Sequence, residues 1–351
     1  MTGLRAALIT SLLAIPLLAC TTNPSPIAPT PTPSPTNMPT ATPSTVLRPT
    51  PTATTTPTTT PTPTLSPTPT LTPSPTPTPS PTPTSPPPAL TIELDPPRVE
   101  QGHTLLVRVH SSAPVTLTGT LDERDLAFVK HGEGYWALVG LPAWSPAGPH
   151  LLTLTAADGM GRAVREEATV EVVAVDFPVE AVALPPDRTR LLTPELVQEE
   201  RERLAPIFQS VTPERLWDGV FVPPVEGEIT SPFGARRSYN GGPPRSYHEG
   251  VDFRGEVGTP VVAANSGRVA LAEALTVRGK AVILDHGLGV HSGYYHLSEI
   301  LVQEGQWVEK GDPIGRVGGT GLATGPHLHW EVRIRGVNVD PLEWTQRLML
   351  P

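Results

Sequence analysis

Residues 90–175 contain short runs in which apolar and polar positions alternate, a pattern typical of half-buried β-strands. The runs are rich in β-branched and aromatic residues, and turn signals such as Asp158-Gly159 separate them. The expected strands are 104–110, 114–120, 135–139, 151–155 and 168–173. Short strands at these intervals predict a small antiparallel β-sandwich.

A connector at 176–224 follows, and its pattern changes from alternation to helical spacing. Thr193 before Pro194 has the form of a helix N-cap with proline at the first helical position. Leu196, Leu204 and Ile207 then fall on one side, and the charged residues 199–203 fall largely on another. This predicts a short amphipathic helix over 195–208 that packs against a neighbouring domain and keeps its charged face in solvent.

Residues 225–345 return to short apolar runs, but glycine now interrupts them frequently. The expected strands are 229–234, 260–264, 267–270, 281–285, 289–297, 307–311, 313–317 and 327–334. Many short strands with frequent glycine favour a strongly bent antiparallel sheet or an open barrel. The folded part is therefore expected to be mainly β, and 90–175 resembles an immunoglobulin-like module with a role in spacing, docking or substrate contact.

The segment before residue 90 has no apolar periodicity. Proline, threonine and serine make up 56 of the 69 residues 21–89, and these residue types cannot build a core. We expect a disordered spacer whose fully extended length is about 200 Å at ~3.1 Å per residue.

The first residues have the form of an export signal. Residues 6–18 are a 13-residue apolar stretch, which spans ~20 Å as a helix and is too short for a ~30 Å membrane core. Its end, Leu17-Leu18-Ala19-Cys20, resembles the lipobox of bacterial lipoproteins. That resemblance implies a signal peptide at 1–19, lipidation of Cys20, a tether at 20–89 and an extracytoplasmic position on a membrane. The alternative is a plain secretory signal with an incidental cysteine.

Charge and cysteine content exclude several classes of function. All 34 acidic residues lie after residue 89, together with 23 of the 25 basic ones, so the folded part is acidic and unsuited to nucleic acid. Cys20 is the single cysteine, which excludes an internal disulfide framework and a zinc site made of thiolates.

Six of the ten histidines fall between 248 and 329, where the chemistry is expected. In a strand over 327–334, alternation places His327, His329, Glu331 and Arg333 on one face. The opposite face is apolar and suited to the core. The polar face is therefore expected to look into solvent or a cleft, where the two imidazoles can converge on one centre.

A second polar pair lies upstream. His248 and Asp252 share one face of an extended segment, and Gly250 between them leaves room for both side chains to approach one ion. Zn²⁺ accepts nitrogen and oxygen ligands, and catalytic sites use three protein ligands with one exchangeable position. His248, Asp252 and one of the paired histidines supply such a set.

These residues resemble the zinc metallopeptidases of family M23, the lysostaphin/LytM type. The resemblance covers about 217–344, and its motifs occur in the family order: His248-x-x-x-Asp252, Tyr294-x-His296-Leu297, Gly305-x-x-Val308-x-Lys310-Gly311-x-x-Ile314-Gly315 and Gly325-Pro326-His327-Leu328-His329. It implies the glycine-rich antiparallel β fold of LytM-like, duplicated-hybrid-motif domains.

The resemblance also implies roles for individual residues. His248, Asp252 and His329 correspond to the zinc ligands, and His296 and His327 correspond to the unligated catalytic histidines. One of these two would accept a proton from water and the other would stabilise the oxyanion, and the sequence leaves the two roles exchangeable. His291 has no counterpart in the motifs and is expected at the rim, and His286 is expected in a turn.

The expected function is that of a membrane-tethered zinc metalloendopeptidase, which hydrolyses peptide bonds of peptidoglycan stems or cross-links. Peptidoglycan peptides, a membrane reached through the lipid anchor and other cell-wall proteins are the expected partners. The alternative is a non-catalytic M23-like activator of another cell-wall hydrolase. The run 305–315 also resembles the hairpin of biotinyl and lipoyl carriers, but Lys310 is not at the usual carrier position.

Overall fold

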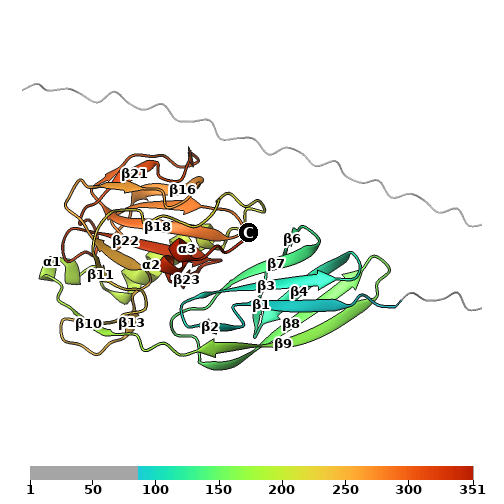
Figure 1. Ribbon diagram of the computed structural model, residues 1–351. Coiled ribbons are helices and arrows are strands. Elements are labelled where there is room, and N and C mark those ends of the chain that lie inside the picture. Colours follow the sequence, from blue (N-terminus) through green and yellow to red (C-terminus); the bar gives the residue numbers. More distant parts are fainter. Residues whose placement is uncertain (1–85, 351) are drawn as a thin grey trace, which may run out of the picture. The chain divides into compact units, whose positions relative to one another are not determined.

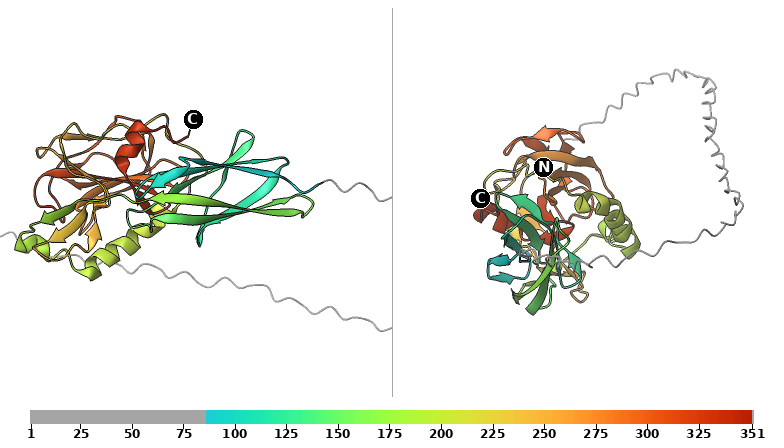
Figure 2. Two further views of the ribbon diagram at one scale, coloured as in Figure 1. Left: turned by 60° about the horizontal axis from the view of Figure 1, so that its bottom comes forward. Right: turned by 90° about the vertical axis from the view of Figure 1, so that its right-hand side faces the viewer.

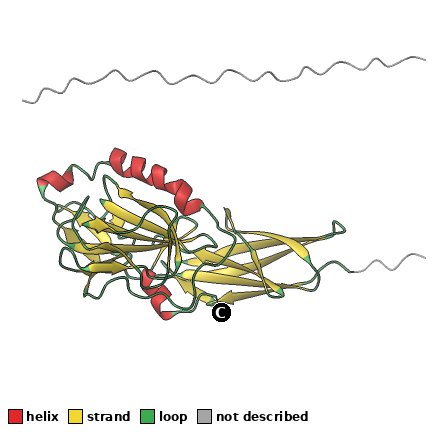
Figure 3. Cartoon of the chain, turned by 90° about the horizontal axis from the view of Figure 1, so that it is seen from above, coloured by secondary structure: helices red, strands yellow, loops and turns green. Residues whose placement is uncertain are grey.

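The computed structural model describes residues 86–350, and these residues form a mainly β protein with few helices, as predicted (Figures 1 and 3). The predicted signal peptide, Cys20 and nearly all of the Pro/Thr-rich spacer lie outside the described residues. Within 86–350, no helix combines the length and the apolar character needed to cross a membrane.

The N-terminal β region consists of two sheets. Its strands are β1 (Leu90–Asp95), β2 (Arg98–Glu100), β3 (Thr104–Ser111), β4 (Val115–Leu121), β5 (Arg124–Asp125), β6 (Val129–His131), β7 (Gly134–Gly140), β8 (Gly148–Asp158) and β9 (Ala163–Val173). One sheet has the order β1-β3-β7-β6 and the other β2-β9-β8-β4-β5. Alternate side chains such as Leu105, Val107, Leu152 and Leu154 fill one buried cluster. The region is thus a sandwich of two sheets packed on this cluster.

The connector contains β10 (Val179–Val182), α1 (Pro186–Thr189) and α2 (Pro194–Gln209). Helix α2 begins as the sequence predicts, because the Thr193 hydroxyl accepts a hydrogen bond from the Leu196 amide at 3.4 Å. Its apolar side packs through Leu204 and Phe208 against Ile283 and Tyr295 of the following β region. The connector is therefore part of the packed structure.

The C-terminal β region contains the remaining elements. They are β11 (Ile229–Ser231), β12 (Arg236–Tyr239), β13 (Ser246–Tyr247), β14 (Val251–Arg254), β15 (Pro260–Val262), β16 (Gly267–Ala274), β17 (Lys280–Asp285), β18 (Val290–Leu297), β19 (Glu299–Ile300), β20 (Trp307–Val308), β21 (Pro313–Arg316), β22 (His327–Ile334), β23 (Val337–Val339) and α3 (Pro341–Gln346). The main sheet has the order β11-β14-β22-β18-β17-β16-β20, with β23 also paired to β22. Figure 2 shows the ribbon of this region, in yellow to red, from two further sides.

Two smaller sheets complete this region. One has the order β15-β21-β19. The other has the order β10-β12-β13, and its parallel pair β10-β12 joins the connector to the C-terminal β region. Register shifts interrupt several pairs, as in β16-β17 between Val269 and Leu271. Such irregularities bend a sheet, which agrees with the predicted strong curvature.

The centre of the main sheet positions the polar residues. Asp252 of β14 lies opposite His329 of β22, and His329 lies opposite Tyr295 of β18. The alternate residues of β22, Leu328 and Trp330, are fully buried in the apolar cluster on the other face. Three adjacent strands therefore bring residues that are distant in sequence onto one polar face.

The sandwich and the C-terminal β region share a buried boundary. Leu106 of the sandwich belongs to the same apolar cluster as Trp344 of α3. The Trp344 indole also donates a hydrogen bond to the Thr104 hydroxyl at 3.2 Å, and the Thr104 amide donates to the Glu343 carboxylate at 2.8 Å. The boundary contains satisfied polar groups as well as apolar contacts.

Candidate active site

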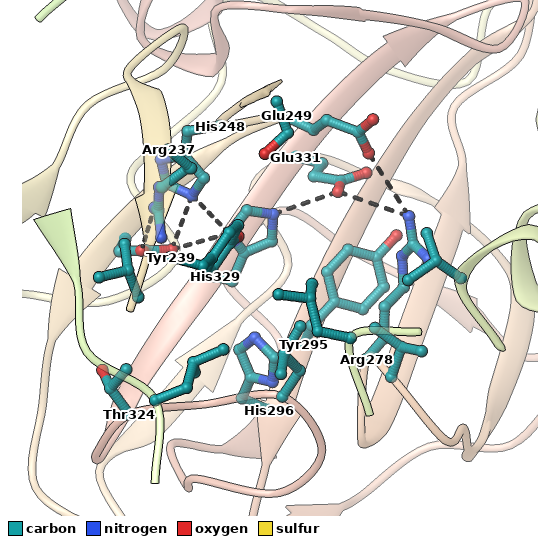
Figure 4. Close-up of a pocket in the computed structure, with 18 of the residues that line it drawn as sticks. Arg237, Tyr239, His248, Glu249, Arg278, Tyr295, His296, Thr324, His329 and Glu331 are labelled. Carbon is teal, nitrogen blue, oxygen red and sulfur yellow. Dashed lines mark hydrogen bonds and ion pairs between the residues drawn. The ribbon is translucent and has the colours of Figure 1, made fainter. Parts of the chain in front are cut away.

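Three side chains converge at one end of the polar face: His248 from the loop before β14, Asp252 from β14 and His329 from β22. Figure 4 shows His248 and His329 side by side. His248 Nε2 lies 3.0 Å from Asp252 Oδ1 and 2.9 Å from His329 Nδ1, and the last two atoms are 2.7 Å apart. Within 86–350 this is the group of His, Asp and Glu residues whose atoms are spaced for a metal ion.

The local backbone explains how His248 reaches this position. The sequence predicted that His248 and Asp252 share one extended segment. In the structure they do not, because strand β13 ends before His248 and β14 begins after Gly250. Gly250 lies in this break, and a Cβ there would stand 2.3 Å from the Trp330 carbonyl oxygen. Glycine is required for close approach of the loop to β22, and not only to leave room for the two side chains.

Hydrogen bonds around the two imidazoles define which nitrogen faces the centre. His248 Nδ1 lies 2.9 Å from the Pro232 carbonyl oxygen, which can only accept, so Nδ1 carries the proton. His329 Nε2 lies 3.1 Å from the Glu331 carboxylate and donates to it. His248 Nε2 and His329 Nδ1 therefore face the carboxylate oxygen of Asp252. These two nitrogens and one oxygen form a donor set suited to zinc.

The electrostatics of this cluster favour positive charge at its centre. Burial alone would raise the pKa of Asp252, but His248 and His329 outweigh it and hold this pKa well below the usual value. Burial likewise lowers the pKa of His329, and hydrogen bonds to Asp252 and Glu331 raise it to about 9. Arg237 Nη2 donates to the other Asp252 oxygen at 3.0 Å. Asp252 therefore stays ionised, and its carboxylate can bind a metal cation.

His296 and His327 lie beside the ligand set. Their ring centroids are 4.8 Å apart, and His327 Nε2 is 3.8 Å from Asp252 Oδ1. Each ring donates its Nδ1 proton to a carbonyl oxygen, His296 to Thr320 at 2.8 Å and His327 to Gly325 at 2.9 Å. The Nε2 lone pairs are thereby left for chemistry.

Both of these histidines are neutral at pH 7. Burial, with the neighbouring His327 and His329, lowers the pKa of His296 to about 3. Burial also lowers the pKa of His327. His296 adopts a left-handed backbone with φ 60°, which costs energy for a residue with a side chain and is held by the surrounding strands.

The five histidine and aspartate positions line a pocket of about 210 Å³. The connector supplies part of the pocket wall through four apolar residues, Val182, Leu184, Leu192 and Val197. The sequence pattern placed these residues in the connector and its short helix, and did not assign them to the site. Their signal was weak because isolated apolar residues in a connector carry no chemistry of their own.

The structure corrects three expectations. The charged face of α2 is not wholly solvated, because Glu200 is buried, with 5% of its surface exposed. The polar face of β22 is largely covered, since Glu331 is 2% exposed. His291 is not at the rim but fully buried, with Nε2 3.2 Å from the Ser210 hydroxyl at the end of α2. Glu200 is covered by the loop that carries Val277 and Arg278, and His291 is covered by the end of α2.

His286 and Lys310 have hydrogen-bond partners that give them structural roles outside the candidate site. His286 follows β17, but its ring is buried between the Ser266 carbonyl and the Ser292 hydroxyl, and burial lowers its pKa to about 4. The Lys310 ammonium donates to the carbonyl oxygens of Asp218 and Val220 at 2.8 and 3.0 Å. An amine with these partners ties the connector to the sheet, unlike the free lysine of a carrier hairpin.

Comparison with known proteins identifies this domain. The model for Peptidase family M23 matches residues 246–341, which include the ligand set and both neighbouring histidines. The catalytic domain of lysostaphin from Staphylococcus simulans is 30% identical, over 37% of this chain and 92% of that domain, with a TM-score of 0.28. The chain belongs to peptidase family M23.

Other M23 relatives resemble the chain over different lengths. A crystal structure assigned to peptidase family M23 from Pseudomonas aeruginosa has a TM-score of 0.50 and 29% identity, over 66% of this chain and 88% of that one. The peptidoglycan DD-endopeptidase ShyA of Vibrio cholerae is 39% identical over 115 residues, 33% of this chain and 27% of ShyA. The chain spans about a quarter of the length of the curated relatives it matches.

Proposed function

We propose that this M23 protein is a zinc metalloendopeptidase that hydrolyses peptide bonds in the stems or cross-links of peptidoglycan. The observation that carries the proposal is the convergence of His248, Asp252 and His329 beside two neutral histidines in one pocket. The name of ShyA, a peptidoglycan DD-endopeptidase, supports the choice of substrate.

The three converging atoms would hold the zinc ion. Two imidazole nitrogens and one carboxylate oxygen are a usual zinc set, and His329 Nδ1 would present its lone pair once zinc displaces the proton from that nitrogen. When bound, zinc acidifies water and polarises a peptide carbonyl. Glu331 and the Pro232 carbonyl hold the outer nitrogens of the two imidazoles, which keeps the ligand atoms oriented.

His327 is the proposed general base. Its Nε2 lies 3.8 Å from Asp252 Oδ1, and its neutral ring can accept a proton from the attacking water and pass it to the leaving amine. His296 lies beside it and would orient the water or the carbonyl group. A His327→Ala variant that loses turnover while it keeps zinc supports this assignment, and unchanged turnover contradicts it.

The proposed location is outside the cytoplasm, at a bacterial membrane. It rests on the lipobox-like sequence that ends at Cys20 and on the Pro/Thr-rich spacer that follows. A lipid on Cys20 would anchor the chain, and the spacer would let the peptidase domain search the cell wall at a distance. A Cys20→Ala protein is expected in the soluble fraction of fractionated cells, whereas the wild type is expected with membranes.

The activity is tested by incubating the full-length protein with purified peptidoglycan and identifying released fragments by mass spectrometry. Peptide-bond cleavage by the wild type, lost with a chelator and in His329→Ala, is the expected result. Equal release in all three samples contradicts the metallopeptidase. Release in none of them, with stimulation of a second hydrolase, would show the activator function.

A further inference from the structure

The Glu331 carboxylate contacts His329, the proposed zinc ligand of β22, on the outer side of its imidazole ring. Its Oε1 lies 3.1 Å from His329 Nε2, on the side of the ring opposite to Asp252. Its Oε2 accepts from Arg333 Nε at 2.8 Å and from the Asn338 amide at 3.2 Å. The Glu331 side chain is thus fixed on both oxygens.

Two arginines surround this carboxylate. Arg333 lies on β22, and Arg278 reaches the same place from the loop before β17, with its Nη2 3.9 Å from Glu331 Oε1 (Figure 4). Both arginines also contact Glu249, at 3.2 Å for Arg333 and 3.6 Å for Arg278. The nearby charges hold the pKa of Glu331 well below its usual value, so the group stays ionised.

Helix α2 supplies the last member of the network. The Glu200 carboxylate accepts from the Val277 amide at 2.7 Å, from the Arg278 amide at 3.1 Å and from Arg278 Nη1 at 3.0 Å. Three donors on one buried carboxylate fix both the backbone and the guanidinium of Arg278. Charge pairs of this kind are costly to break, because removing one partner leaves the other buried and unpaired.

The network therefore forms a continuous path from the connector to the proposed zinc site. Tyr295 lies alongside it, with its ring stacked 5.7 Å from the ring of His329 and 5.3 Å from the Arg278 guanidinium. The aromatic ring packs against both groups. Arg278, Glu331 and Tyr295 also line the pocket, whereas Glu200 lies outside its lining and can reach the site only through Arg278.

We infer that helix α2 helps to orient a proposed zinc ligand of the active site. Glu200 of α2 positions Arg278, and Arg278 and Arg333 together position Glu331. The Glu331 carboxylate then orients the His329 ring. Glu331 and Glu200 are positioning residues in this scheme. The inference rests on the zinc site of the proposed function. It assigns a role to the connector, which the sequence pattern presented as a helix with a solvated charged face.

The test measures zinc affinity in the full-length protein by competition with a chromophoric chelator. Glu331→Gln is expected to weaken zinc binding about 10- to 100-fold, as is usual for partners of a ligand histidine. Glu200→Gln acts one residue further away and is expected to weaken it about 3- to 10-fold. The matched control is Glu199→Gln, because Glu199 is the exposed neighbour on the same helix and should leave the affinity unchanged.

A second measurement separates positioning from plain stability. If Glu200 positions His329, the rise in unfolding midpoint from chelator to zinc is smaller in Glu200→Gln than in the wild type. If the midpoint falls equally in zinc and in chelator, and the affinity is unchanged, the inference is wrong. Should Glu331→Gln not fold, the Glu200 and Glu199 pair decides. A wild type that binds zinc but leaves peptidoglycan intact contradicts the proposed function alone.

Discussion

Strand β8 of the sandwich and strand β22 of the M23 domain have similar alternating sequences but different surroundings. Along β8, buried residues such as Leu152 and Leu154 alternate with exposed or half-buried ones. Every residue of β18 is buried, and most of β22 is buried on both faces. The difference is that the connector covers the polar face of the M23 sheet, whereas the outer face of the β8-β9 sheet is left to solvent.

Covering the polar face changes the chemistry of the same residue types. His150 of β8 pairs with Asp122, which is 52% exposed, in a contact that water can replace. His329 of β22 pairs with Asp252 and Glu331 in a setting where water is largely excluded. Polar groups without water must satisfy one another, and this forces the polar residues of β22 into a fixed cluster. The different chemistry of the two Asp-His pairs therefore follows from the burial of the polar face of β22, and not from the alternating pattern of the strand.

The largest expected effect separates the two Asp-His pairs. Asp252→Asn removes the anion at the centre of the ligand set, so peptidoglycan cleavage should fall to background and zinc affinity should collapse. The matched change Asp122→Asn in the sandwich should leave both unchanged. Fragment release and zinc competition measure the two results, and equal loss in both variants would remove the contrast between the regions.

Removal of zinc should affect the two regions unequally. At a zinc concentration 1,000 times the dissociation constant, binding stabilises the folded state by about 4 kcal/mol. A chelator should therefore speed amide hydrogen exchange in β14 and β22, while β8 and β9 keep their protection. Mass spectrometry of exchanged peptides measures this. Uniform loss of protection would mean that the sandwich and the M23 domain unfold as one unit.

The packing of helix α2 on the polar face of the M23 sheet can be weakened by removing the N-cap of the helix. Thr193→Ala removes the acceptor for the Leu196 amide and should lower the free energy of unfolding by about 1 kcal/mol. Exchange should rise in α2 and over the buried face of β18, and not in the sandwich. Thr189→Ala, which changes a threonine on α1, is the comparison. An unchanged α2 would show that packing through Leu204 and Phe208 alone holds the helix.

The smallest effect concerns the exposed pair of the sandwich. Burial alone would lower the pKa of His150, but its bond to Asp122 outweighs this and raises the pKa above the usual 6.5. The stabilisation is therefore complete below pH 6.5 and is lost as the pH rises through the raised pKa. Its size is about 0.2–1 kcal/mol, because Asp122 is exposed. Unfolding midpoints of wild type and His150→Ala between pH 5 and 8 should converge at the higher pH.

Much of the fold and part of the site were predictable from local pattern. Strand β22 was predicted at its observed bounds, and α2 was predicted to within one residue at each end, because strand alternation and helix capping are local signals. The motif resemblance pointed to the five histidine and aspartate positions that line the pocket. The burial of Glu200, Glu331 and His291 was missed, since each depends on what packs above it.

The sequence by itself determined the mainly β class, the family and the residue types of the candidate site, because periodicity and motif spacing are written along the chain. Only the tertiary structure decided which elements cover the polar face of β22. Pairing of β14, β22 and β18 brings Asp252 and His329 together across 77 residues, and α2 buries the charges behind them. Burial and electrostatic coupling arise from contacts between distant segments, and a local pattern carries no record of them.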